Sequence, residues 1–447
     1  MSDILIQNPL IINEGISFRG DVLVSDEIIS AVALPGQIEV PEKTGKLDAS
    51  GLILIPGVID DHVHFREPGL SHKGDIFTET RAAVAGGITS FMDMPNTVPQ
   101  TISNRDLEHK FRIGSEKSLI NYSFYIGATE NNLDEIMNTD PARVCGIKLF
   151  MGASTGNMLV SNENSLRELF KKALIPLAVH CEDETTIRRN TESFRKKYGD
   201  DIPMAMHPLI RSRDACFKSS SLAVRLAREY NTRLHVLHLS TADEMKLFSS
   251  GKTIEEKRIT GEACVHHLWF DDSDYEKLGS KIRWNPAIKT IFDRKALTEA
   301  LNSDVIDVIG TDHAPHTLEE KSGVYLESPS GAPMVQHSLT AMLELWHRKI
   351  FSLEKIVEKM CHNPAVLFNI SKRGFIREGY KADLVLIDPD HEWMVSENNI
   401  LYKCGWSPFE GLAFRSKVVK TFVNGNLVYN YGEINNDHRG RALSFDR

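Results

Sequence analysis

The chain has little that points to secretion, a membrane or nucleic acid. Its 447 residues include only six cysteines, none in a Cys-x-x-Cys pair, so we expect free thiols in the reducing cytoplasm. No apolar run is long enough to span a bilayer, and Met1–Ile6 has no basic residue before its apolar ones, so we expect no secretory signal. The net charge of −9 is spread along the chain without a basic stripe, which argues against a nucleic-acid partner.

Between residues 52 and 310, short apolar runs alternate with longer helix-forming stretches. Strand followed by helix, repeated along one stretch, predicts an α/β fold of the (β/α)8 TIM-type barrel class. The eight runs predicted as strands are Ile53–Ile59, Ile88–Met94, Tyr122–Ile126, Cys145–Phe150, Pro176–His180, Leu234–His238, Arg258–Cys264 and Val305–Gly310.

The two ends of the chain instead carry short alternating strands separated by turn residues. Near the C-terminus, Val423-Asn424-Gly425-Asn426 predicts a β-hairpin. We therefore predict that residues 1–52 and 376–447 form one small β domain beside a barrel of residues 53–375. The stretch Thr311–His337 follows the last predicted barrel strand and contains no clear element, so we expect either an active-site lid, which its position favours, or a tolerated surface insertion.

Polar residues recur at the ends of the predicted barrel strands, where the active face of such a barrel lies. Imidazole and carboxylate groups suit zinc, and two neighbouring cations suit hydrolysis, so this pattern predicts a two-metal hydrolytic site. The residues are His62 and His64 after the first strand, Lys148 in the fourth, His180 and His238 at the ends of the fifth and sixth, and Asp312 after the eighth.

Lys148 lies between Ile147 and Leu149, where a buried ammonium group is costly. It either pairs with a nearby carboxylate, or its amine has reacted with CO2 to form a carbamate that bridges two cations. The other histidines near strand ends are expected to pack or cap, and His313 is expected to orient Asp312.

Five motifs lie at or near the ends of the predicted barrel strands: Asp61–Gly69, His72–Ile76, Asp93–Thr97, Glu262 with His266–Leu268, and Gly310–His316. These segments resemble the cyclic amidohydrolases of the amidohydrolase superfamily, and among them most closely the dihydroorotases. The resemblance implies that His62, His64 and Asp312 hold one zinc ion and that His180 and His238 hold the second. It also implies that Lys148 is the carboxylated bridge, although some members use an aspartate there, and that Asp312 is the catalytic acid and base.

The resemblance further implies a substrate that bears a carboxylate. Arg66, Asn96 and His316 match the family's carboxylate-binding residues, and Asn285 matches a residue near the ring. The alternatives are a surface ion pair between Arg66 and Glu67 and a turn role for Asn96. The chain departs from the family pattern at Ala287 and Lys289, and where Met334-Val335-Gln336 replaces Gly-Leu-Glu.

The expected activity is the zinc-dependent, reversible cyclisation of N-carbamoyl-L-aspartate to L-dihydroorotate, a step of pyrimidine synthesis. The expected partner is this small-molecule substrate, and the sequence leaves open whether the chain forms a homo-oligomer. The alternatives are another cyclic amidohydrolase, such as an allantoinase or a hydantoinase (dihydropyrimidinase), and a non-catalytic scaffold with the same fold.

Overall fold

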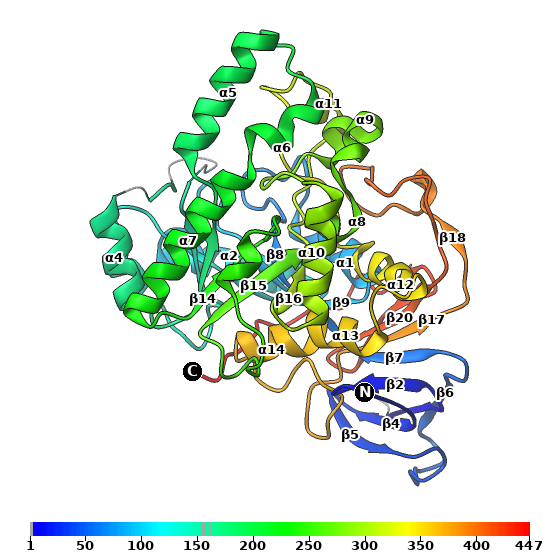
Figure 1. Ribbon diagram of the computed structural model, residues 1–447. Helices are drawn as coiled ribbons and strands as arrows, with labels where there is room; N and C mark the ends of the chain where they lie inside the picture. The colour runs from blue at the N-terminus through cyan, green and yellow to red at the C-terminus, as the bar shows by residue number, and fades with distance from the viewer. Residues whose placement is uncertain (1–2, 153–157, 161) are drawn as a thin grey trace.

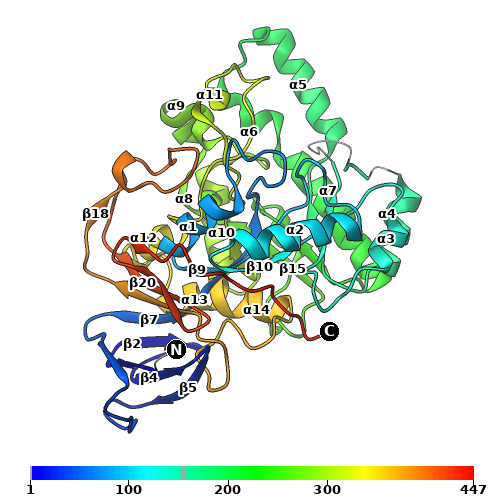
Figure 2. The same cartoon turned by 180° about the vertical axis from the view of Figure 1, so that it is seen from behind.

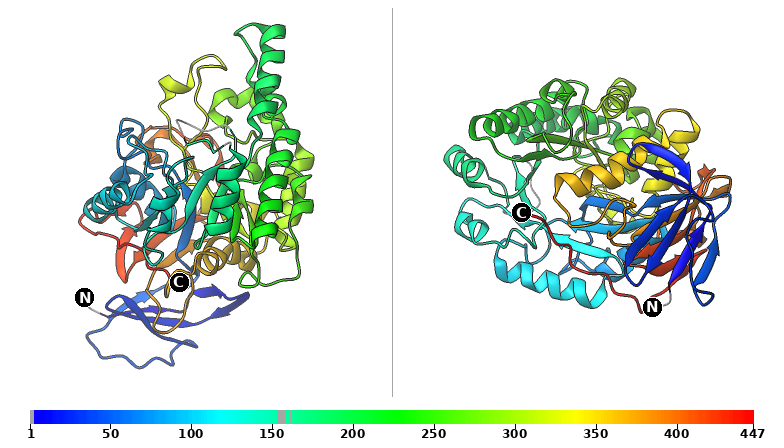
Figure 3. Two further views of the ribbon diagram at one scale, coloured as in Figure 1. Left: turned by 90° about the vertical axis from the view of Figure 1, so that its left-hand side faces the viewer. Right: turned by 90° about the horizontal axis from the view of Figure 1, so that it is seen from below.

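A barrel of parallel strands, surrounded by helices, makes up most of the molecule (Figures 1 and 3). The structure is a computed structural model that describes residues 3–152, 158–160 and 162–447. Its barrel strands are β8 (Val58–Val63), β9 (Ile88–Asp93), β10 (Asn121–Phe124) continued by β11 (Ile126–Gly127), β12 (Ile147–Phe150), β13 (Leu177–His180), β14 (Leu234–Val236), β15 (Ile259–Cys264) and β16 (Val308–Gly310).

The ring of strands is closed between its last and first members. Neighbouring strands pair in sequence order from β8 to β16, and a bridge between Val63 and His313 joins the two ends. The Thr311 hydroxyl also donates to Asp60 Oδ2 at 2.6 Å. The predicted (β/α)8 TIM-type fold is therefore confirmed.

The first predicted strand was wrong in its first half. Residues Ile53–Pro56 form a separate strand, β7, which pairs with the small domain rather than with the barrel. Gly57 lies between β7 and β8, where no larger residue fits, because a Cβ atom would lie 2.0 Å from the Thr89 hydroxyl. Apart from its glycine, this apolar run gives no sign that it serves two different sheets.

Helices follow the strands and cover the outside of the barrel. Their first turns carry the expected caps: Asp75 accepts from the Thr78 amide at the start of α1, and Thr290 and Asp293 form a capping box on α10. The helices are α1 (Ile76–Ala85), α2 (Asn104–Lys117), α3 (Leu133–Met137), α4 (Glu163–Lys172), α5 (Glu184–Tyr198), α6 (His207–Ile210), α7 (Arg213–Tyr230), α8 (Val265–Trp269), α9 (Tyr275–Leu278), α10 (Ile291–Asn302), α11 (Leu318–Lys321), α12 (Ser338–His347), α13 (Leu353–Val357) and α14 (Asn363–Leu367). Within the described ranges, none of them is long and apolar enough to cross a membrane.

Both ends of the chain contribute to a small β domain below the barrel (Figure 1). One sheet has the order β5-β4-β1-β6, and the other has the order β22-β21-β20-β17-β7-β2-β3, so N-terminal and C-terminal strands pair directly. The strands are β1 (Ile4–Gln7), β2 (Leu10–Asn13), β3 (Ile16–Arg19), β4 (Asp21–Ser25), β5 (Ile28–Ala33), β6 (Gly45–Asp48), β17 (Leu384–Asp388), β20 (Lys417–Val423), β21 (Asn426–Asn430) and β22 (Glu433–Ile434).

The predicted hairpin in this domain is confirmed, since Val423 pairs with Asn426 and both turn residues have positive φ angles. The last residues leave the domain again. Figure 2 shows the C-terminal segment running past β10, where Ala442 bridges to Tyr122. The division of the chain at residues 52 and 376 stays a prediction.

Candidate metal centre and substrate cavity

The predicted site residues meet around one cavity of about 760 Å³. The cavity lies at the carboxyl ends of the barrel strands, because its lining includes residues at or just after the ends of β8, β13 and β16. Its lining includes all the predicted residues: His62, His64, Arg66, Asn96, Lys148, His180, His238, Asn285, Asp312 and His316. The structure thus brings the set together, while the role of each residue stays a prediction.

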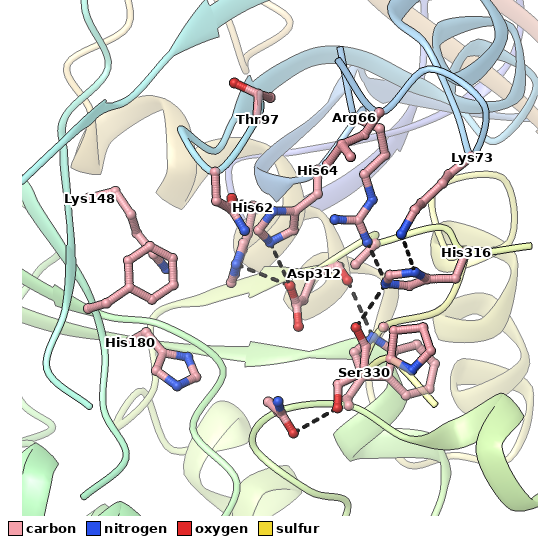
Figure 4. Close-up of a pocket in the computed structure, with 18 of the residues that line it drawn as sticks. His62, His64, Arg66, Lys73, Thr97, Lys148, His180, Asp312, His316 and Ser330 are labelled. Atoms are coloured by element: carbon pink, nitrogen blue, oxygen red, sulfur yellow. Dashed lines mark hydrogen bonds and ion pairs between the residues drawn. The ribbon is translucent and has the colours of Figure 1, made fainter. Parts of the chain in front are cut away.

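His62, His64 and Asp312 form one candidate cation site (Figure 4). The Nε2 atoms of both histidines lie 3.2 Å from Asp312 Oδ1. Their Nδ1 atoms face other acceptors, namely Glu262 Oε1 at 3.0 Å and Asn96 Oδ1 at 2.9 Å. Because each Nδ1 donates its proton outward, two Nε2 lone pairs and a carboxylate oxygen converge on one point. This donor set fits a divalent cation, and Glu262 and Asn96 fix the required tautomers.

His180 and His238 form a second pair beside the first cluster. His180 Nδ1 lies 2.9 Å from His238 Nε2, and the His62 and His238 rings are 5.2 Å apart. Burial, together with the neighbouring His180, lowers the pKa of His238 well below its usual value. Both rings are buried, and a neutral imidazole is the form that binds metal.

Lys148 lies beside this second pair, on the same side of Asp312 as His180 (Figure 4). It is buried, and its ammonium group lies 4.8 Å above the Phe150 ring. Among the described residues, no carboxylate lies within ion-pair distance of it, so the ordinary salt-bridge explanation of this lysine is wrong. Burial lowers the pKa of Lys148 to about 8, which leaves a sizeable neutral fraction near neutral pH.

Three site residues adopt left-handed backbone conformations, which side chains other than glycine rarely do. The φ angles are +69° at Arg66, +38° at His238 and +47° at Asp312. Such strain persists only where the surroundings hold it. At Asp312, the Trp284 indole N–H donates to the main-chain carbonyl at 3.3 Å.

The other end of the cavity is positively charged. The buried Arg66 donates from Nε to the Pro315 carbonyl at 3.0 Å, and its Nη2 lies 2.9 Å from His316 Nε2. Within the described residues, no carboxylate pairs with it. The alternative pairing with Glu67 is wrong, because Glu67 accepts from the Ile76 amide and from Lys117. A guanidinium group that is buried without an anion is suited to receive one from a ligand.

Two other sequence interpretations need correction. Asn96 contacts His64 through its carbonyl oxygen, so it orients a candidate ligand, and its role is not confined to a turn. His313 was expected to orient Asp312, but its Nε2 lies 3.0 Å from Glu79 Oε2 and its Nδ1 accepts from the Met334 amide. His313 therefore connects Glu79 of α1 to the main chain at Met334.

Some lining residues were not predicted from sequence. Lys73 and Ser330 face the same end of the cavity as His316 (Figure 4). Lys73 lies within the motif His72–Ile76, so a signal existed. Ser330 lies in the stretch Thr311–His337, and only its place in a long loop pointed to it. This stretch contains α11 and lines the cavity through Pro329–Gly331, while its movement as a lid stays a prediction.

The model of the amidohydrolase family matches residues 53–428. This chain belongs to the amidohydrolase family. The dihydroorotase of Methanosphaera stadtmanae is 33% identical over 84% of this amidohydrolase and 85% of its own length. The dihydroorotase of Pyrococcus furiosus is 31% identical over 96% of this chain and 93% of its own. The structure is also similar to the L-hydantoinase (dihydropyrimidinase) of Arthrobacter aurescens, with a TM-score of 0.90, 27% identity and 97% coverage of both chains. The amidohydrolase described here is therefore a dihydroorotase-like, cyclic amidohydrolase of a metal-dependent superfamily.

Proposed function

We propose that this amidohydrolase is a zinc-dependent dihydroorotase, which interconverts N-carbamoyl-L-aspartate and L-dihydroorotate. One observation carries the proposal. The cavity combines a cluster of candidate metal ligands with a buried Arg66 at its other end, which has no carboxylate partner in the part of the chain that the structure describes. Dihydroorotate has the matching pair of groups, a cyclic amide to be opened and a carboxylate to be held. The six free cysteines support a reducing cytoplasmic setting as part of this proposal.

The proposed metal content is two zinc ions. His62, His64 and Asp312 would hold one ion, and His180 and His238 would hold the other, with Lys148 as a carbamate between them. Two observations support this assignment. The protons of His62 and His64 point away from the first cluster, and His180 Nδ1 lies 2.9 Å from His238 Nε2 beside it. Conversion of Lys148 into an anionic carbamate removes a buried positive charge from a place where two cations would repel it. Zinc ions, when bound, activate water and polarise a carbonyl group.

Asp312 is the proposed acid and base. Although burial raises its pKa, the neighbouring His62 and His64 outweigh this effect and lower the pKa of Asp312 below its usual range. The ionised carboxylate can accept a proton from the attacking water as the ring amide is opened, and can return that proton to the departing nitrogen. Arg66, Asn96 and His316 hold the substrate carboxylate, and all three line the cavity. Asn285, which accepts from the Ser330 hydroxyl at 3.0 Å, contacts the ring.

A hydantoinase or dihydropyrimidinase activity is the second candidate, favoured by the structural similarity to the Arthrobacter aurescens enzyme. The sequence departures at Lys289 and Gln336 do not favour it. Gln336 bonds through its side chain to the Asn399 carbonyl and the Leu401 amide, and Lys289 donates to the Ala287 carbonyl. Neither residue lines the cavity, so neither carries an argument about the substrate.

The deciding experiment is a substrate panel with zinc-reconstituted protein. We expect the highest catalytic efficiency with L-dihydroorotate, ahead of dihydrouracil, hydantoin and allantoin, because only dihydroorotate places a carboxylate beside Arg66. Higher efficiency with dihydrouracil or hydantoin would establish the second candidate instead. No turnover of any cyclic amide by protein with a full zinc complement would support the non-catalytic scaffold.

A further inference from the structure

His316 is surrounded by four hydrogen-bonding groups, two at each ring nitrogen. Its Nδ1 lies 3.0 Å from Lys73 Nζ and 3.3 Å from Glu320 Oε2. Its Nε2 lies 2.9 Å from Arg66 Nη2 and 3.1 Å from the Ser330 carbonyl oxygen. Burial, together with the adjacent Arg66 and Lys73, lowers the pKa of His316. The ring is therefore neutral and carries a single proton, which can satisfy only some of these contacts.

Two arrangements are possible for that proton. With the proton on Nδ1, the ring donates to Glu320, and Nε2 accepts from Arg66. With the proton on Nε2, the ring donates toward Ser330 and the cavity, and Nδ1 accepts from Lys73. The first arrangement uses an Arg66 N–H on the histidine and turns a lone pair toward the cavity. The second leaves two N–H groups side by side, a fork that a carboxylate completes.

Lys73 selects between these arrangements. An ammonium group can only donate, so a lysine held near Nδ1 requires a lone pair on that nitrogen. The Arg66 guanidinium also only donates, and at 2.9 Å from Nε2 it makes the opposite demand until a ligand carboxylate takes its N–H. Once Arg66 is so engaged, Lys73 at Nδ1 and the Ser330 carbonyl at Nε2 both favour a proton on Nε2. Lys73 is held there by an ion pair with Glu320 Oε1 at 2.9 Å, and its side chain is only 13% exposed. That ion pair uses Oε1, while Glu320 Oε2, the oxygen 3.3 Å from Nδ1, already accepts from the Thr317 amide at 3.1 Å. Figure 4 shows Lys73, His316 and Arg66 together at one end of the cavity.

We propose that Lys73 is a positioning residue that holds His316 in its Nε2–H tautomer, so that His316 and Arg66 together donate to the substrate carboxylate. This inference rests on the proposed dihydroorotase function. Lys73 acts through His316 and does not contact the reacting atoms. Without it, the His316 proton moves to Nδ1, and a lone pair faces the substrate anion.

The kinetic test compares Lys73→Met with native, zinc-loaded enzyme. We expect KM for L-dihydroorotate to rise about tenfold, as for the loss of one charged hydrogen bond, with kcat and zinc content nearly unchanged. Dihydrouracil, which has no carboxylate, should show no change in KM. Lys73→Arg, which also donates only, should restore most of the affinity. Lys381→Met is the matched control, because Lys381 forms a similar 2.9 Å ion pair, with Glu27, in the small domain.

A second comparison separates positioning from direct contact. In a His316→Ala background, Lys73→Met should add no further rise in KM. If the two effects multiply, Lys73 binds the substrate itself, and the proposal is overturned. An unchanged KM in the Lys73→Met enzyme overturns it as well. Native protein that turns over no dihydroorotate counts against the proposed function instead.

The tautomer can be measured without turnover. In protein with ¹⁵N-labelled histidine, the His316 signals are those lost in His316→Ala. In metal-free protein with L-dihydroorotate bound, their shifts should show a protonated Nε2 in the native protein and a protonated Nδ1 in Lys73→Met. A proton on Nδ1 in this native complex would refute the proposal.

Discussion

Replacing Arg66 by methionine tests whether the cavity was built for an anion. The Arg66 side chain is 7% exposed, and its contacts are to a carbonyl oxygen and to His316. Burial lowers the pKa of Arg66 to about 10, so the group is still charged at neutral pH. Methionine keeps a similar unbranched stem and removes only the charge and the donors.

The magnitude follows from the contacts that are lost. A hydrogen bond to a charged group contributes about 1.5–3 kcal/mol, and about 1.4 kcal/mol corresponds to a factor of ten. We therefore expect the kcat/KM for L-dihydroorotate to fall roughly tenfold to hundredfold. Because Arg66 has no carboxylate partner within the described residues, its removal also relieves a buried charge, and the free energy of unfolding should not fall.

The assay measures kcat/KM for L-dihydroorotate and for dihydrouracil, zinc content, and urea unfolding, on native and Arg66→Met protein. The fall should be confined to dihydroorotate, while zinc content and the unfolding midpoint stay unchanged. An equal loss with both substrates would show that Arg66 serves the reaction centre or the fold and not the carboxylate. Undiminished efficiency with dihydroorotate would also contradict the reasoning.

Four further outcomes are expected. Removal of metal by a chelator should abolish activity, and full activity in metal-free protein would contradict the two-zinc site. His180→Ala should lower zinc occupancy and turnover together. Lys148→Ala should be inactive and partly restored by short carboxylic acids, and the absence of rescue alongside a free amine seen at Lys148 would reject the carbamate. Only a neutral amine reacts with CO2, so reactivation of metal-free, CO2-depleted enzyme by zinc at a fixed concentration of dissolved CO2 should accelerate as pH rises toward about 8, the pKa of Lys148, and level off above it. A rate that is flat or falls below pH 8 at fixed dissolved CO2 would contradict that order. Lys110 forms a buried ion pair with Asp93, whose Oδ1 accepts from the Phe65 amide at 2.8 Å. Lys110→Met should therefore lower the free energy of unfolding by about 3–5 kcal/mol, because it leaves the Asp93 carboxylate buried without its partner. A loss below about 1 kcal/mol in urea titration would refute a stabilising role for this ion pair.

The order of apolar runs and helices was enough to predict the barrel, because alternating strands and helices have few other ways to bury their apolar faces. The ends of the strands were less certain. The first strand was misplaced because the apolar run Ile53–Ile59 continues from β7 into the start of β8, and these two strands differ in their pairing partners. Glycine at position 57 was the only local sign of the change.

The histidines, Lys148 and Asp312 could be placed at one end of the barrel from sequence, since parallel strands bring their carboxyl ends together. The hydrogen-bond partners could not be predicted, because they come from strands and loops far apart in the chain. Glu262 meets His62 across 200 positions, and Lys73 meets His316 across 243. The sequence by itself determined which chemical groups are present and on which face they gather. The tertiary structure decided which nitrogen of each imidazole points into the cavity, because that depends on contacts that only folding creates.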